Sequence, residues 1–289
     1  MSGILITGGT GYLGHGLVRR LLELGHERVR VYSRGEFSQF KMAQAFVGSW
    51  LGKPGVPPRL AFFVGDVRDQ DRLERAMHGI SIVIHAAALK RIEVGHYNPD
   101  EMVKTNVLGT MNVIEAARRA GVERVVFVSS DKAFAPVSPY GTSKALAEQL
   151  VLAANRQSLG PRYVVCRYGN VAGSTGSVIP TWRARIAAGE PIRVTNPDCT
   201  RFWMTLEQAV ELVLEAFTTD EDLLIPQLPA YRLGDLASAM VAPGGRILYP
   251  TGLAAWEKQH ESMAEGNSSD RARRLHIEEL RELLKGVPE

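Results

Sequence analysis

The glycine-rich stretch Thr7-Gly8-Gly9-Thr10-Gly11-Tyr12-Leu13-Gly14 decides the fold of this chain of 289 residues. It follows the apolar run Ile4-Leu5-Ile6, which predicts a buried strand, and it opens a helical pattern of leucines that ends near Gly25. Glycines at a spacing of three allow a tight turn, close approach of backbone N–H groups to a pyrophosphate, and packing of the helix on the strand. We therefore predict that a dinucleotide binds here, in contact with Gly8, Thr10, Gly11, Tyr12, Leu13 and Gly14.

Apolar runs separated by helical patterns continue through the first two thirds of the chain. Strands are expected at 29–32, 60–64, 82–85, 125–128 and 163–167, and helices at 99–120, from about 140, and at about 276–285. Strands that are apolar throughout indicate a parallel sheet covered on both faces. With right-handed crossovers, this predicts a doubly wound α/β fold of the Rossmann type.

The alternation of strand and helix patterns becomes irregular from about Gly169, where glycine and proline become frequent. We expect residues 1–168 to form the dinucleotide-binding domain, which also carries the catalytic residues. Residues 169–289 are expected to form a smaller C-terminal substrate-binding lobe that is interleaved with the sheet. The segment 48–58 is rich in glycine and proline and is expected to be a surface loop.

The composition is that of an ordinary globular protein, with 45% hydrophobic and 22% charged residues. A net charge of +3 without a long basic block does not indicate nucleic acid binding. Cys166 and Cys199 form neither a disulfide framework nor a metal-ligand motif. No signal sequence and no apolar run of the ~18 residues needed to cross a membrane is found. We expect a cytoplasmic protein without a metal ion.

The residues after the second expected strand bear on the choice of dinucleotide. An acidic side chain there would accept a hydrogen bond from the ribose 2′-hydroxyl of NAD, but this chain has Ser33 and Arg34. Arginine pairs with a 2′-phosphate, which favours NADP, although the nearby Glu36 keeps NAD possible. After the third and fourth strands, Asp66 and Val67 are expected to flank the adenine, and Ala86, Ala87 and Ala88 to lie beneath the ribose and nicotinamide.

Tyr140 and Lys144 are one helical turn apart and therefore face the same way. A neighbouring ammonium stabilises tyrosinate, so we expect Lys144 to bring the tyrosine pKa of ~10 toward the working pH. Tyr140 could then accept the proton of an alcohol while hydride passes to nicotinamide. Asn106, in the long helix, could bind a backbone carbonyl and a proton-relay water at the cofactor, or be merely a polar helix residue.

Asp131 and Lys132 follow the fifth expected strand, at the edge of the sheet where ligands bind in such folds. Once C4 of a sugar is a ketone, its C5 proton is acidic and an amine can remove it. A protonated carboxyl can then deliver a proton to the departing C6 hydroxyl. A simple dehydrogenase needs neither group. The alternative interpretation is a surface ion pair on a loop.

Taken together, these motifs resemble the extended short-chain dehydrogenases/reductases, specifically the UDP-N-acetylglucosamine 4,6-dehydratase (inverting) family. The resemblance runs from residue 4 to about 206, and a weaker match continues over 256–261. The matching segments are ITGGTGYLG, VYSR, GDVRD, HAAALK, NPDEMVKTNV, SSDKA, YGTSK, RYGNVAGSTGSVIP and TRFWMT.

The resemblance implies a role for each of these residues. Tyr140 would be the oxidation base, Lys132 the C5 base and Asp131 the acid for water loss. Retaining relatives tend to carry methionine in place of Tyr140, so inversion at C5 is expected. The nucleotide-sugar would contact Lys90, Asn170, Arg201 and Glu257.

The family also implies a reaction and an assembly. Hydride would leave C4, water would be lost across C5–C6, and the hydride would return to C6 to give a 6-deoxy-4-keto sugar. A homo-oligomer, either a dimer or a hexamer, is implied; an apolar stripe that includes Val103 and Met111 suits either the core or an interface. A nucleotide-sugar 4-epimerase and a catalytically silent dinucleotide-binding scaffold are the alternatives.

Overall fold

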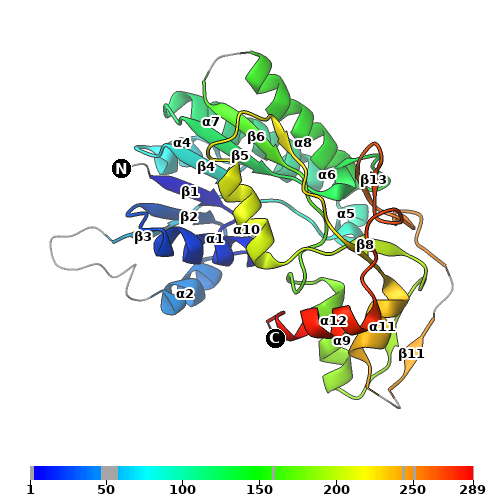
Figure 1. Cartoon of the computed structure of the whole chain (residues 1–289). Coiled ribbons are helices and arrows are strands. Elements are labelled where there is room, and N and C mark those ends of the chain that lie inside the picture. Colours follow the sequence, from blue (N-terminus) through cyan, green and yellow to red (C-terminus); the bar gives the residue numbers. More distant parts are fainter. Residues whose placement is uncertain (1–2, 47–57, 158–159, 243–244, 250–251, 289) are drawn as a thin grey trace.

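A computed structural model describes residues 3–46, 58–157, 160–242, 245–249 and 252–288. Its centre is a seven-stranded parallel sheet in the order β3-β2-β1-β4-β5-β6-β9 (Figure 1). All six predicted strands are confirmed, and with them the doubly wound fold. The strands are β1 (Ile4–Thr7), β2 (Val29–Ser33), β3 (Leu60–Val64), β4 (Ile82–His85), β5 (Arg124–Val128), β6 (Arg162–Cys166) and β9 (Leu223–Leu224).

Helices cover both faces of the sheet because successive strand side chains point to opposite faces. Ile4 and Ile6 of β1 belong to the core beneath α1 (Tyr12–Glu23), α2 (Glu36–Ala45) and α10 (Leu206–Glu215). Leu5 belongs to the opposite core, beneath α4 (Gln70–Met77), α7 (Gly109–Arg119) and α8 (Pro139–Arg156). Buried apolar surface on both faces is what fixes these strands in the interior.

The helix predicted over 99–120 begins at Pro99 as expected, but it is not a uniform α-helix. It consists of α6 (Pro99–Met102), a π-helical turn over Val103–Leu108, and α7. A short helix, α5 (Ile92–Tyr97), precedes it. Of the apolar stripe, Val107 is buried, whereas Val103 and Met111 are each nearly half exposed. Core packing therefore accounts for only part of the stripe.

The C-terminal part has its own core, formed by α9 (Val178–Ala187), α11 (Leu233–Met240) and α12 (Ile277–Lys285). The last of these corresponds to the helix predicted at 276–285. Three strand pairs accompany the helices: β8 (Thr200–Phe202) with β10 (Ala230–Arg232), β7 (Ile192–Arg193) with β11 (Ile247–Leu248), and β12 (Ser262–Ala264) with β13 (Asn267–Ser268).

The chain returns to the sheet after it first leaves it at the end of β6. Helix α10 packs beside α1, and β9 joins the sheet as its seventh strand (Figure 1). Residues 206–224 thus contribute β9 to the sheet and α10 to the layer that covers it. The loop predicted over 48–58 lies outside the described residues, apart from Pro58. Among the described residues, no helix has both the length and the apolar character needed to cross a membrane.

Candidate active site

A cavity of about 860 Å³ lies between the carboxyl ends of the strands and the C-terminal part of the chain. The topology explains its place, since the connections that follow parallel strands all leave the sheet at one edge. Every residue predicted for the site lines this cavity except Asn106. The predicted residues that line it are Gly8, Thr10, Gly11, Tyr12, Leu13, Gly14, Ser33, Arg34, Asp66, Val67, Ala86, Ala87, Ala88, Lys90, Asp131, Lys132, Tyr140, Lys144, Asn170, Arg201 and Glu257.

The glycine-rich loop forms a cradle that side chains would fill. Gly8 has a φ of +69°, and a Cβ there would lie 2.8 Å from the backbone of Ala87. A Cβ on Gly14 would lie 2.1 Å from the carbonyl oxygen of Gly9, so the helix could not pack on the loop. Gly11 is the N-cap residue of α1 and has no side chain that could accept a hydrogen bond from the first N–H groups of the helix. The first N–H groups of α1 are therefore available for a pyrophosphate, and the loop fits a dinucleotide.

Charged side chains meet at the carboxyl ends of β2 and β3. The Arg34 guanidinium lies 3.9 Å from the carboxylate of Asp66, and its side chain is more than half exposed. Arg68 binds the same carboxylate at 2.7 Å. Arg34 is therefore held only loosely and can turn to another anion.

Asn106 is buried in the π-helical turn and fastens two segments together. Its side-chain oxygen accepts from the N–H of Leu89 at 2.8 Å, and its amide donates to the Leu89 carbonyl at 2.9 Å and to Ser143 Oγ at 2.9 Å. The expected bond to a backbone carbonyl is present. Asn106 thereby positions the segment that carries Lys90, but it does not line the cavity.

Tyr140 and Lys144 lie at the start of α8, which is capped by Ser138 with Pro139 in the first turn. Lys144 is buried, and its ammonium donates to the Val128 carbonyl at 2.6 Å and lies 3.9 Å from the ring centre of Phe127. Burial lowers the pKa of Lys144 to about 7.

The expectation that Lys144 lowers the pKa of Tyr140 is wrong for this structure. Burial raises the pKa of Tyr140, and the opposing influences come from a hydrogen bond with Ser130 and from the charge of Lys132. The physical reason is that the Lys144 amine is directed at a backbone carbonyl and is itself difficult to keep charged.

Asp131 and Lys132 form a 3₁₀ turn directly after β5, and Asp131 is only 1% exposed. The interpretation as a surface ion pair is therefore wrong. Asp131 Oδ1 accepts from Ser130 Oγ at 2.9 Å and from Lys132 Nζ at 3.1 Å. Its Oδ2 is buried and has no hydrogen-bond partner among the described residues. Burial raises the pKa of Asp131, which suits a carboxyl that must hold a proton.

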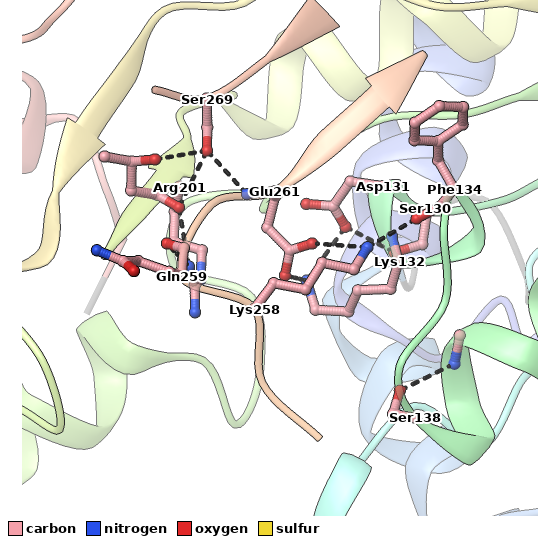
Figure 2. Close-up of polar contacts among 12 residues, drawn as sticks. Ser130, Asp131, Lys132, Phe134, Ser138, Arg201, Lys258, Gln259, Glu261 and Ser269 are labelled. Carbon is pink, nitrogen blue, oxygen red and sulfur yellow. Dashed lines mark hydrogen bonds and ion pairs between the residues drawn. The ribbon is translucent and has the colours of Figure 1, made fainter. Parts of the chain in front are cut away.

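A second carboxylate, which the sequence did not single out, lies on the other side of Lys132. Glu261 Oε1 is 3.4 Å from Lys132 Nζ, and Glu261 Oε2 is 3.4 Å from Lys258 Nζ (Figure 2). Burial alone would lower the pKa of Lys132, but Asp131 and Glu261 together raise it above its usual range. The weak family match over 256–261 was the only signal for this segment, and it led to Glu257 rather than Glu261.

The residues expected to bind the sugar nucleotide surround this centre. Arg201 donates to the carbonyls of Thr200 at 2.8 Å and Gln259 at 3.1 Å, which holds its guanidinium at the cavity. Asn170 Oδ1 is buried without a partner among the described residues. Trp256 also lines the cavity and lies against the ring of His96, with 4.4 Å between ring centres. Sequence reasoning did not identify Trp256 as a site residue.

The chain is similar to known proteins over nearly its whole length. The chain is 39% identical over 272 residues to the UDP-N-acetylglucosamine 4,6-dehydratase (inverting) of Campylobacter jejuni, covering 92% of this chain and 78% of that protein. It is 37% identical over 279 residues to the UDP-glucose 4-epimerase of Rickettsia rickettsii, covering 93% and 79%. The crystal structure of Pen from Bacillus thuringiensis superposes with a TM-score of 0.90 at 32% identity, covering 99% and 97% of the two chains.

A family model described as polysaccharide biosynthesis protein matches residues 4–280. That range includes the glycine-rich loop, the Asp131–Lys132 and Tyr140–Lys144 pairs, and the segment that carries Glu261. The chain therefore belongs to the polysaccharide biosynthesis protein family of the extended short-chain dehydrogenases/reductases.

Proposed function

We propose that this protein is a nucleotide-sugar 4,6-dehydratase, a hydro-lyase that acts on UDP-N-acetylglucosamine or a close relative and inverts C5. The observation that carries the proposal is the pair of the buried Asp131 with Lys132, which shares one cavity with Tyr140 and the glycine-rich loop. The 39% identical Campylobacter relative supports the same activity.

A nicotinamide dinucleotide fits the cradle formed by the glycine-rich loop, and Arg34 favours NADP over NAD. When bound, it accepts hydride from C4 of the sugar and returns it to C6. The residues that would hold it are those predicted from the sequence, with Asn106 acting through Leu89. Tyr140 would take the proton of the C4 hydroxyl in this step as a tyrosinate, which it must form against the rise in pKa that its burial causes.

The Asp131–Lys132 pair carries out the elimination. A proton moves along their 3.1 Å hydrogen bond from Lys132 Nζ to Asp131 Oδ1, which leaves a neutral amine beside a neutral acid. The amine removes the C5 proton, and the carboxyl protonates the C6 hydroxyl as it leaves as water. Lys132 then returns a proton to the opposite face of C5. The proton that Tyr140 took from the C4 hydroxyl balances the one that leaves with the water.

Incubation of the purified protein with UDP-N-acetylglucosamine in D₂O, followed by NMR, tests the proposal. The expected product is a 4-keto sugar with a new C6 methyl group and deuterium at C5, and its C5 couplings should report inversion. A product without the methyl group, or no reaction with any UDP- or dTDP-sugar, would contradict the proposal. We further propose that the protein acts in the cytoplasm as a homo-oligomer.

A nucleotide-sugar 4-epimerase is the second candidate, because the Rickettsia relative of that name is nearly as similar. An epimerase also oxidises C4 but has no elimination step, so it does not use an acid and a base at C5 and C6. Asp131→Asn and Lys132→Ala would leave an epimerase largely active. In a dehydratase, each would abolish formation of the methyl group.

A further inference from the structure

We infer that Glu261 is a positioning residue of the elimination step, which holds the Lys132 amine in place and stabilises the ammonium formed when that amine takes the C5 proton. The inference rests on the proposed function. It adds a third member to the Asp131–Lys132 pair, contributed by the C-terminal part of the chain.

The contact between Glu261 and Lys132 places a buried negative charge beside the amine that becomes an ammonium. Glu261 is 3% exposed, and its Oε1 lies 3.4 Å from Lys132 Nζ. On the other side of the amine, Asp131 Oδ1 lies at 3.1 Å. An amine between two carboxylates has little freedom to rotate, so it keeps one orientation toward the sugar. A charge that appears on it is stabilised more strongly than in water because the site is buried.

The backbone of Glu261 is also held in place by hydrogen bonds. Its backbone N–H donates to Ser269 Oγ at 2.9 Å, and Ser269 Oγ donates to the Thr200 carbonyl at 3.1 Å (Figure 2). Two residues further along, the Met263 carbonyl accepts from Arg167 Nη1 at 2.6 Å. Arg167 is itself paired with the buried Glu148 next to the sheet. These bonds attach β12 to the Rossmann core and set the depth at which Glu261 enters the cavity.

Several charged groups face this carboxylate, and together they define its effect. Lys132 approaches from the turn after β5, Lys258 from the segment before β12, and Arg201 from β8. Asp131 is the other anion, and the charges of Asp131 and Lys132 both act on Tyr140. Lys258 Nζ is also held by the Phe134 carbonyl at 2.7 Å. Removal of the Glu261 charge should therefore lower both apparent pKa values of the coupled Asp131–Lys132 pair.

Glu261→Gln in the full-length protein tests the inference by 4-keto sugar formation over a range of pH. We expect kcat to fall about 100-fold with KM changed less than about threefold, because the substrate is bound by other residues. We also expect the pH–rate profile to move to lower pH by about one unit. Glu261→Asp, which keeps the charge, should recover part of kcat and most of the shift in the profile.

Ser269→Ala is the matched control, because it loosens the same strand without removing the carboxylate. It should lower the melting temperature and, because the Glu261 carboxylate remains, move the midpoints of the pH–rate profile less than Glu261→Gln does. Equal kcat and equal midpoints for wild type and Glu261→Gln would overturn the inference. If the wild-type protein itself forms no 4-keto sugar, the proposed function fails instead.

Discussion

Lys132 and Lys144 line one cavity, the first with a side chain that is 20% exposed and the second buried, and their surroundings are opposite. Lys132 lies between Asp131 and Glu261, and these carboxylates raise its pKa. Lys144 lies against the Val128 carbonyl and the ring of Phe127, and burial lowers its pKa to about 7. Burial disfavours the charged form of both. Asp131 and Glu261 more than offset this effect at Lys132, whereas the charge of Glu148 does not offset it at Lys144.

The difference indicates that the two lysines act in different steps of the reaction. An amine with a pKa of about 7 lies beside the tyrosine and the cofactor cradle, where oxidation would take place. An amine that stays charged until its proton moves to Asp131 sits where water is eliminated. The pKa of each amine is therefore set by its own neighbours. Substitutions of Lys144 and Lys132 should separate C4 oxidation from the elimination of water.

Lys132→Met should have the largest effect, because it removes the base and one partner of the acid. We expect formation of the 6-deoxy-4-keto product to fall at least about 10³-fold. Oxidation at C4 does not need this amine, so reduced nicotinamide should accumulate and be visible in the absorbance spectrum when UDP-N-acetylglucosamine is added. If Lys132→Met also abolishes the reduced signal, the assignment of the two lysines to different steps is wrong.

Lys144→Met should act on the other half of the reaction. We expect both product formation and the reduced-nicotinamide signal to fall about 100-fold, since the residue adjoins Tyr140 and lines the cofactor cavity. Single-turnover measurements of the absorbance change would separate this loss from a slow elimination. A variant that oxidises C4 at the wild-type rate but forms no product would contradict the assignment.

Much of this site could be predicted because its signals are local. The glycine-rich loop, the strand runs and the pairs at 131–132 and 140–144 each lie within one turn or one helix, where spacing alone determines which side chains share a face. The parallel sheet then brings these loops to a common edge. This is why one cavity contains nearly all of the predicted residues.

What could not be predicted depends on contacts between distant segments. Glu261 reaches Lys132 only because Arg167 and Ser269 hold β12 against the core, and no local pattern around Glu261 reports this. The raised pKa of Tyr140 likewise depends on burial, which spacing on a helix does not reveal. The return of β9 to the sheet rests on a strand of two residues, too short for a periodic signal.

The low pKa of Lys144 predicts a pH-dependent cost in stability. The folded pKa of about 7 lies below the unfolded value of about 10.5, so the unfolded chain binds more protons between these values and wild-type stability rises with pH across that window. Lys144→Met removes the cost. At pH 6 we expect the cofactor-free variant to be more stable by about 2 kcal/mol, since a gain of roughly 4 kcal/mol is partly offset by the lost hydrogen bond.

Urea unfolding at pH 6 and pH 9 measures this effect. The advantage of the variant should shrink at pH 9, where Lys144 of the folded wild type is already neutral. If Lys144→Met is more stable than wild type by the same amount at both pH values, removal of the Lys144 charge is not the cause. Burial would then lower the pKa of Lys144 less than the contrast with Lys132 implies.

Arg34→Ala should have the smallest effect, because Arg34 follows β2, which β1 and β4 separate from β5 in the sheet, whereas Lys132 follows β5 and Lys144 lies on α8. Its guanidinium is more than half exposed and lies 3.9 Å from Asp66, so it can move toward a 2′-phosphate at little cost. We expect the Kd for NADP to rise about tenfold while that for NAD changes less than about twofold, measured by calorimetry on cofactor-free protein. Equal weakening of both would mean that Arg34 contacts a part common to the two dinucleotides. The NADP preference would then have to come from other residues. In either case, we expect Arg34→Ala to leave the kcat of the cofactor-loaded enzyme unchanged, because the variant alters neither the Asp131–Lys132 pair nor the Tyr140–Lys144 pair.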